Sequence, residues 1–163
     1  DQFIRSDKQC AILPYLADIA TLEITLNTSY YAKDDKALPL DYLASLEPET
    51  LPFAQIHFRD SVQLISSEYA VDRIRDFCLS DKNGDPPKIN HDAPIYLMIS
   101  RPELDVQILP INEVEYFALQ QVSTHPLGEA LECIVARYPA FDFSQFIQKY
   151  MHLKTFKKAG TET

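Results

Sequence analysis

Few side chains in this sequence are of the types that carry out covalent or metal chemistry, and their spacing does not bring them together. The four histidines form no His-x3-His or Glu-x-x-His pair, and the three cysteines lack metal-ligand spacing. The three glycines are too dispersed for a phosphate-binding loop, and no Gly-x-Ser-x-Gly motif holds a nucleophilic serine. The sequence therefore predicts a protein that is not an enzyme by itself, has no cofactor or metal, and acts by recognition.

Composition narrows the class of partner. The 163 residues carry 15 Lys and Arg against 24 Asp and Glu, a formal net charge of −9, and 46% of them are hydrophobic, which is typical of a globular protein. The acidic balance argues against nucleic acid or an anionic membrane as the main partner, because phosphate binding depends on Lys and Arg. No apolar run approaches the ~18 residues of a membrane span, and three scattered cysteines fit a reducing compartment. We therefore expect a cytoplasmic protein with no membrane contact.

The N-terminal part is expected to be mainly helical. Residues 12–31 place Pro14 in a first turn and apolar side chains on more than one stripe, which predicts a long helix buried between layers or against a partner. A second, short helix is expected at 41–47 with Asp41 as its cap. Because the sequence enters its first helix almost at once, we expect a C-terminal part of a longer protein, with residues 1–50 as a helical entry segment.

The middle of the chain alternates between strand and helix patterns. Residues 54–58 show the period-two alternation of a half-buried strand, and 61–66 form a second candidate strand. The spacing in 70–80 predicts a short amphipathic helix. Residues 81–92 contain an Asn-Gly pair and two prolines, which predict a loop.

The last third predicts a winged-helix-like unit. Apolar residues alternate through 95–100 and again through 104–108 across a turn at 101–103, which is the pattern of a hairpin. Three helices are expected to follow, beginning after Pro110, at Pro126 with Thr124 or His125 as cap, and at Asp142, before a final strand or helix extension at 153–158. The predicted fold class is α+β, with a long N-terminal helix, a short antiparallel sheet and a three-helix unit. The predicted domains are residues 1–50, a C-terminal domain at 51–158 and a tail at 159–163.

A winged helix invites a second interpretation, a transcription regulator that binds DNA. The helix that enters the major groove would be 143–152, in which Lys149 is the one Lys or Arg, and residues 111–163 carry five cationic against six anionic side chains. DNA readers normally show a basic face around the recognition helix. DNA binding is therefore the alternative, and an interaction module for another kind of partner is a third possibility.

Two stretches of the chain resemble a known bacterial family. They are LPYLADIATLE at 13–23 and the pattern Leu64-x-Ser66-Ser67-x-Tyr69-x-Val71. The family was long labelled as a DNA-binding domain and is now associated with the multinuclear non-haem iron oxidative (MNIO) enzymes, including partner proteins of methanobactin-type systems. Two positions depart from its pattern: Arg59-Asp60 stands where His-Pro is frequent, and Arg75 where an aromatic residue is frequent.

The resemblance implies a non-catalytic subunit. Such a protein binds an iron-dependent peptide-modifying enzyme and helps to present its ribosomally made precursor peptide. The resemblance also implies a further N-terminal helical domain before this part, of which residues 1–50 would be the remnant or the connector. The last third is also similar to the winged helix of the peptide chaperone of pyrroloquinoline-quinone biosynthesis, through packing signals such as Gly128-Glu129-Ala130-Leu131 and Phe143-x-x-Phe146-Ile147. Both similarities imply peptide recognition.

Recognition by strand addition needs a free sheet edge beside a groove. The candidate peptide-binding residues come from the strand at 104–109 and the helix at 143–152, with two of them, Lys149 and Tyr150, expected at the rim of the groove. They are Leu104, Val106, Gln107, Ile108, Phe146, Lys149 and Tyr150. Ordinary core packing is the favoured interpretation of Leu104, Val106, Ile108 and Phe146, whereas nothing in core packing requires Gln107 or Lys149. The candidate interface with the enzyme or with the missing domain consists of Tyr15, Asp18, Leu22 and Glu23, for which a buried helix with satisfied polar groups is the alternative.

Overall fold

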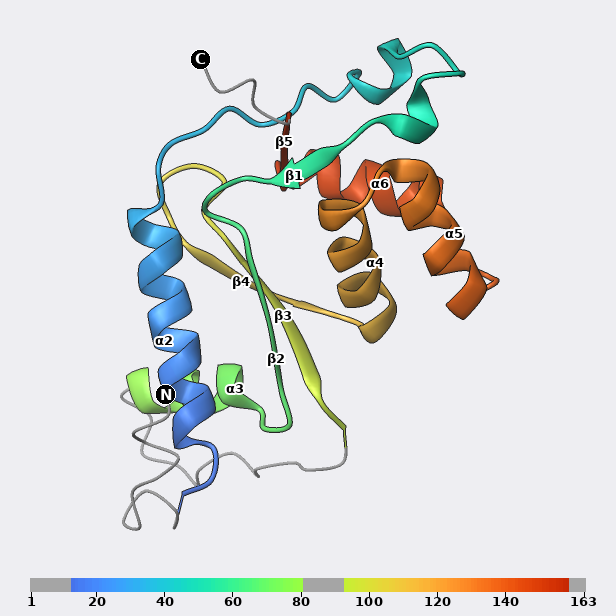
Figure 1. The fold of residues 1–163 in the computed structure, drawn as a ribbon. Coiled ribbons are helices and arrows are strands. Elements are labelled where there is room, and N and C mark those ends of the chain that lie inside the picture. Colours follow the sequence, from blue (N-terminus) through green and yellow to red (C-terminus); the bar gives the residue numbers. More distant parts are fainter. Residues whose placement is uncertain (1–12, 81–92, 159–163) are drawn as a thin grey trace.

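A computed structural model describes residues 13–80 and 93–158 (Figure 1). Its first half contains α2 (Leu16–Tyr31), two short 3₁₀ helices at Leu43–Ser45 and Leu51–Phe53, β1 (Ile56–Phe58), β2 (Gln63–Ser67) and α3 (Val71–Leu79). Its second half contains β3 (Ile95–Ser100), β4 (Gln107–Ile111), α4 (Glu113–Thr124), α5 (Leu127–Arg137), α6 (Phe143–His152) and β5 (Phe156–Lys158). This is the predicted α+β fold, with the predicted element order.

The centre of the fold is a three-stranded antiparallel sheet in the order β2-β3-β4. β3 pairs with β2 through Leu97 and Ile65, and with β4 through Ile99 and Ile108. The hairpin predicted from apolar alternation is therefore confirmed. Its second strand begins at Gln107 and not at residue 104, so the turn between the two strands is longer than predicted.

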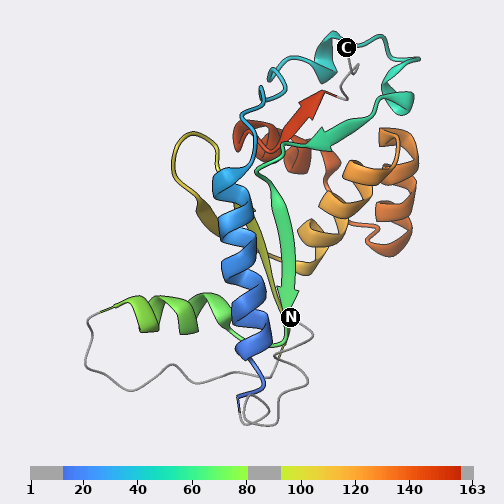
Figure 2. The same ribbon diagram turned by 60° about the vertical axis from the view of Figure 1, so that its left-hand side comes forward.

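The sheet is covered on both faces, as Figures 1 and 2 show. α2 and α3 contribute Leu22 and Val71 to one core, which they share with Leu97 and Ile99 of β3. Helices α4, α5 and α6 form a larger core with the opposite face, to which β3 contributes Met98. Alternate residues of β3 thus point into different cores, as the pleat of a strand requires.

A second, two-stranded sheet joins distant parts of the sequence. β1 pairs with β5 in antiparallel register, with Phe58 opposite Phe156 and His57 opposite Lys157. Phe156 is 1% exposed and belongs to the larger core. Leu38, which lies within the predicted segment 1–50, donates its backbone N–H to the Phe156 carbonyl at 2.8 Å and is buried in the same core. The division of the chain at residue 50 stays a prediction.

Several local predictions need correction. The expected helix at 41–47 is only the 3₁₀ turn Leu43–Ser45, and its start has no side-chain cap. Pro110 lies inside β4, and α4 begins after a capping box in which Asn112 accepts from the Glu115 N–H at 2.8 Å. Pro126 itself occupies the cap position of α5. The Asp142 cap of α6 is confirmed. The predictions for 81–92 and 159–163 fall outside the described residues.

Candidate peptide-binding site

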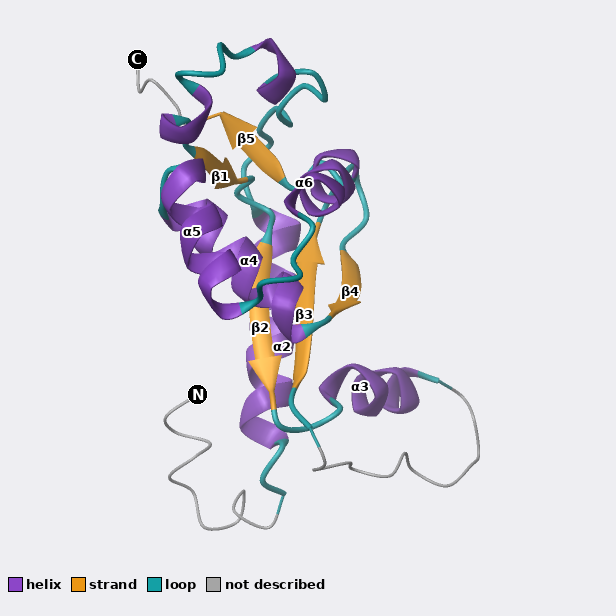
Figure 3. Cartoon of the chain, turned by 90° about the vertical axis from the view of Figure 1, so that its right-hand side faces the viewer, coloured by secondary structure: helices purple, strands orange, loops and turns teal. Residues whose placement is uncertain are grey.

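β4 is an edge strand with one open side (Figure 3). Within the described residues, β3 is its only neighbour in the sheet. Pro110 stands opposite Leu97, and a proline in a sheet lies where its nitrogen points away from the partner strand. Because backbone groups of alternate residues point to the same side of a strand, the N–H and C=O of Ile108 also point to the open side. β4 can therefore accept an added extended segment centred on Ile108.

A groove of about 510 Å³ lies beside this strand. It is bounded by the hairpin turn, by the groove-facing residues of β4 and by the end of α6. Its lining includes Glu103, Leu104, Gln107, Leu109, His152 and Lys154. The groove combines apolar side chains with charged groups at its rim, which is the composition that strand-addition sites use for side-chain selection.

The predicted β4 residues fall into two groups. Leu104 is 82% exposed and lies in the hairpin turn, and Gln107 is exposed, and both line the groove. Val106 and Ile108 are half-buried and pack against the smaller core on the other face of the sheet. Of the four residues predicted from this segment, Leu104 and Gln107 therefore line the groove, and Val106 and Ile108 do not.

Two predicted residues of α6 belong to the core. Phe146 is 5% exposed and Tyr150 is fully buried, and their ring centroids lie 4.9 Å apart. Tyr150 was expected at the rim of the groove, and that prediction is wrong: helical spacing places it beside Phe146, one turn along the same apolar face. Burial raises the pKa of the Tyr150 hydroxyl far above its ordinary value, and the neighbouring Glu115 carboxylate raises it further. The hydroxyl is buried without a well-formed hydrogen bond to any described residue.

Lys149 lies in a different hollow from the β4 residues. Its ammonium forms an ion pair with Glu115 and lies 5.1 Å from the centre of the Tyr150 ring. Together with Phe146 it lines a hollow of about 910 Å³ between the starts of α4 and α6 and the end of α5. The structure thus does not bring Lys149 together with Gln107.

The residues of α6 that do face β4 were missed from the sequence. They are its last residue, His152, and the two residues that follow it, Leu153 and Lys154. Lys154 has φ of 54°, the left-handed region that favours glycine, and its N–H bonds the Met151 carbonyl at 3.0 Å. Its ammonium forms an ion pair of 3.1 Å with Glu103 across the groove. Because no glycine follows the helix, the sequence pattern carries no sign of this helix-ending turn.

The four predicted interface residues of α2 lie mostly against the chain's own elements. Leu22 is fully buried in the core of the α2 layer. Asp18 accepts a hydrogen bond of 2.6 Å from the Ser67 hydroxyl, and Glu23 accepts one of 2.7 Å from Arg75. The ring of Tyr15 meets Tyr69 edge-on at 6.4 Å between centroids. Leu22 therefore offers no surface to a partner.

The outer surface of α2 nevertheless has the character of an interface. Its large exposed apolar residues are Ile24 in the middle of the helix and Tyr30 and Tyr31 in the last turn, which are 59%, 58% and 76% exposed. Three threonine hydroxyls, at Thr21, Thr25 and Thr28, donate to carbonyls four residues back, so they need no water. Exposed large apolar side chains that gather in this way are candidates for contact with a partner.

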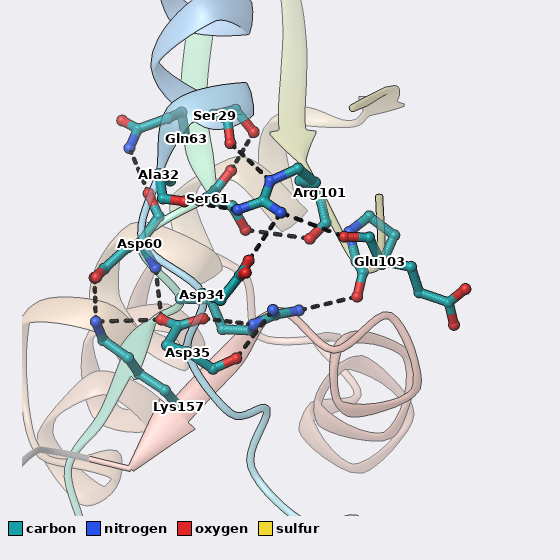
Figure 4. A network of polar contacts seen from close by, with 12 residues as sticks. Ser29, Ala32, Asp34, Asp35, Asp60, Ser61, Gln63, Arg101, Glu103 and Lys157 are labelled. Carbon is teal, nitrogen blue, oxygen red and sulfur yellow. Dashed lines mark hydrogen bonds and ion pairs between the residues drawn. The ribbon is translucent and has the colours of Figure 1, made fainter. Parts of the chain in front are cut away.

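A polar network fixes the hairpin that carries β4 (Figure 4). Arg101, which follows β3, donates to the carbonyls of Ser29 at 3.2 Å and Ala32 at 2.6 Å at the end of α2. It also pairs with Asp34 at 2.9 Å. Arg59 reaches the turn itself through the Pro102 carbonyl at 3.3 Å. The turn of the hairpin is therefore held against the end of α2 and the β1–β2 turn.

Asp35 is the acceptor at the centre of this network. Its carboxylate receives Arg59 Nε at 2.8 Å, the Asp60 backbone N–H at 2.8 Å and Lys157 Nζ at 3.3 Å. Burial alone would raise the pKa of Asp35, but these hydrogen bonds outweigh burial and hold the pKa below its ordinary value. Hydrogen bonds to Asp60 and Asp35 raise the pKa of Lys157 in turn. Each of these two shifts favours the charged form of its group, so the Asp35–Lys157 ion pair is present at neutral pH.

The remaining side chains offer little for metal chemistry. No group of three or more His, Cys, Asp or Glu side chains in the described residues could hold a metal ion. None of the helices in residues 13–80 and 93–158 has the length and apolar character that a membrane crossing requires.

Comparison with family models, curated proteins and solved structures finds no match to this chain.

Proposed function

We propose that this chain is a non-catalytic accessory subunit that binds an iron-dependent peptide-modifying enzyme and its ribosomally made precursor peptide in the bacterial cytoplasm. The observation that carries the proposal is the open side of β4 beside a groove. A peptide strand added at Ile108 gains backbone hydrogen bonds from β4. Its alternate side chains enter the groove that Leu104 and Gln107 line.

The enzyme is proposed to dock on the outer surface of α2. This surface is uncharged apart from Glu23, whose carboxylate is already paired with Arg75. α2 packs against the face of the sheet onto which Ile108 of β4 also projects, so both proposed surfaces belong to the same half of the fold.

The DNA-binding alternative receives less support from the geometry. Lys149, the one Lys or Arg of the predicted recognition helix, is paired with Glu115. Lys154, just after that helix, is paired with Glu103. Phosphate binding by either lysine requires that its ion pair be broken first.

The test is co-expression of the full chain, carrying an affinity tag, with the iron oxidase and the precursor peptide encoded beside its gene. We expect both to co-purify with the chain. In Ile108→Pro, the open side of β4 loses its N–H donor, while the β3–β4 hydrogen bonds, which come from the other residues, remain. Peptide recovery should fall at least tenfold, and enzyme recovery should persist.

Ser66→Pro is the matched control. Ser66 is exposed on β2, the other edge of the same sheet, and by the same alternation its N–H points away from β3. This variant should leave peptide recovery unchanged. If neither partner co-purifies with the wild-type chain, or if Ile108→Pro and Ser66→Pro retain the peptide equally, the proposal is wrong. A gel-shift assay with salt titration tests the DNA alternative, which demands binding that weakens steeply with salt.

A further inference from the structure

A groove of about 500 Å³ lies between α5, α6 and the two 3₁₀ helices, and we name it the α5–α6 groove. None of its lining residues is charged, and its apolar members include Leu43, Leu51, Leu127, Leu131, Phe143 and Ile147. The polar side chains in the lining are those of Ser144 and Gln148, which are exposed on α6. The α5–α6 groove shares no residue with the groove beside β4, so it is a separate surface of the fold.

The wall that the second 3₁₀ helix forms is packed directly on α5. The Leu127 N–H donates to the Ala54 carbonyl at 3.0 Å, which ties the end of this 3₁₀ helix to the start of α5. Next to it, a Cβ atom at Gly128 would lie 3.0 Å from the Cβ atom of Pro52, closer than side chains normally approach. Glycine therefore permits this contact, and the wall is a fixed part of the fold.

Large apolar side chains continue from the α5–α6 groove onto the exposed surface. Leu51 in the lining is 37% exposed, and Phe53, at the end of the same 3₁₀ helix, is 78% exposed. Val135 is 39% exposed and lies one turn after Leu131, on the same face of α5. An apolar groove with exposed apolar residues beside it is a candidate for contact with a partner.

Unpaired acidic side chains flank the lining residues in the sequence. Residues 37–55, which supply the wall with the two 3₁₀ helices, contain no Lys, Arg or His and three exposed acidic residues, Asp41, Glu47 and Glu49. On α5, Glu132 is exposed directly after Leu131. None of these four carboxylates forms an ion pair within residues 13–80 and 93–158. Their charge is therefore available to a partner.

The Lys and Arg side chains of the two helices are already engaged away from the groove. Arg137 of α5 pairs with Glu113 at 2.9 Å, and Lys149 of α6 pairs with Glu115. Both cations line the hollow between the starts of α4 and α6. The α5–α6 groove thus has an apolar lining and unpaired negative charge beside it. A partner with an apolar face and cationic residues next to that face complements both.

We propose that the α5–α6 groove binds an amphipathic helix of a partner protein, whose apolar face enters the groove and whose Lys or Arg residues lie beside that face. A helix is favoured over an extended peptide because the walls are themselves helical. The backbone groups in the interior of α5 and α6 are bonded within each helix, so the groove offers side chains and no strand edge. The occupant must therefore satisfy its own backbone hydrogen bonds, as a helix does.

The probe for the test is a fluorescein-labelled peptide of sequence KKALKALLKALKKA, titrated with the full chain and followed by fluorescence anisotropy. Its leucines follow the i, i+3, i+4 and i+7 spacing of one helix face, and its lysines lie beside that face. We expect binding with a dissociation constant in the micromolar range.

Two control peptides separate the contributions of charge and of helical structure. The peptide EEALEALLEALEEA keeps the leucines and carries the opposite charge. The peptide KKALKPLLKALKKA keeps the leucines and the lysines but contains a proline that breaks the helix. Each control should bind at least tenfold more weakly than the lysine peptide.

Gln148→Lys places a positive charge in the lining and should weaken binding of the lysine peptide at least fivefold. Because Gln148 is exposed, this substitution leaves the core unchanged. Gln120→Lys is the matched control, because Gln120 is exposed on α4, which does not line the α5–α6 groove. It changes the net charge equally and should leave binding within twofold of the wild type.

The acidic residues are tested by a second pair of variants. Glu47→Gln combined with Glu49→Gln should weaken binding of the lysine peptide at least threefold. Glu68→Gln combined with Asp76→Asn removes the same charge from exposed positions in α3 and just before it, and should have no such effect.

The inference is overturned if the wild-type chain does not bind the lysine peptide, if either control peptide binds equally well, or if Gln148→Lys and Gln120→Lys behave alike. Sedimentation equilibrium of the chain alone tests a second copy as the occupant. A dimer that Gln148→Lys dissociates would also overturn the inference. Ile108→Pro should bind the lysine peptide as the wild type does, because β4 is no part of this groove, so failure of this inference is separate from failure of the proposed function.

Discussion

Replacing Asp35 by Asn tests whether the polar network holds the β4 hairpin in place. The side chains of Asp35 and Arg59 are only 14% and 10% exposed, so Arg59 loses a buried partner that water does not replace. Breaking one side of a buried ion pair costs about 3–5 kcal/mol. Asn keeps one acceptor oxygen and can still receive one donor, so we expect a loss of about 3 kcal/mol in the free energy of unfolding at pH 7. In a protein of this size the melting temperature should fall by about 6–12 °C.

The assay is urea denaturation followed by circular dichroism at several pH values. The folded-state pKa of Asp35 lies below its unfolded value, so the carboxylate contributes stability above the unfolded pKa and loses it as pH falls through the folded pKa. The gap between Asp35→Asn and wild type should therefore narrow as the solution becomes strongly acidic.

Asp34→Asn is the matched control for this experiment. Asp34 pairs with Arg101 but is 88% exposed, and exposed pairs contribute about 0–1 kcal/mol. If the two variants differ by less than about 0.5 kcal/mol at pH 7, or if the gap does not depend on pH, the network is not the support that we infer.

Two further predictions concern α6 and the turn after it. Phe146→Ala should destabilise the chain by about 3–5 kcal/mol, because it empties a core position. Tyr150→Phe should be neutral or stabilising by up to about 1 kcal/mol, because it removes a buried hydroxyl without a well-formed hydrogen bond. Thermal denaturation compares the two variants, and a large loss of stability in Tyr150→Phe would mean that the Tyr150 hydroxyl does have a hydrogen-bond partner. Lys154→Gly should raise the free energy of unfolding, measured by urea denaturation, by about 0.5–1 kcal/mol, because glycine adopts the left-handed backbone conformation of this position without strain. If the variant is less stable than the wild type, the ion pair of Lys154 with Glu103 contributes more than the backbone strain of Lys154 costs.

The elements whose patterns are local could be predicted from the sequence. Alternation identified β3 and β4, and the cap at Asp142 placed the start of α6, because both signals lie within one element. The start of α4 was predicted less accurately, because Pro110 has the character of a helix boundary. Pro110 instead lies in the edge strand β4, where its missing N–H breaks no hydrogen bond of the sheet. Asn112 and Glu115, three residues apart, carry the signal that could have placed the start of α4.

The candidate site could be predicted only in part, because it depends on contacts between distant elements. The pattern of α6 gives its apolar face but does not say which of its ends approaches β4, so Phe146 and Tyr150 were preferred to Lys154. The pairing of Arg59 with Asp35, and of Arg101 with the end of α2, joins segments whose sequence positions give no hint of contact. Such partners become visible only once the tertiary fold is known.

The pairing of β1 with β5 has a consequence for how the chain folds. Phe58 meets its partner Phe156 only after almost the whole described chain has been made, and Thr155 supplies the carbonyl that receives the Arg59 N–H at 3.0 Å. Pairings so far apart in sequence form slowly, because a long loop must close before any contact rewards it. During synthesis, the larger core therefore lacks Phe156 until β5 leaves the ribosome, and a chain that stops before Phe156 leaves β1 without the strand that pairs with it in the described residues, which exposes an edge to aggregation.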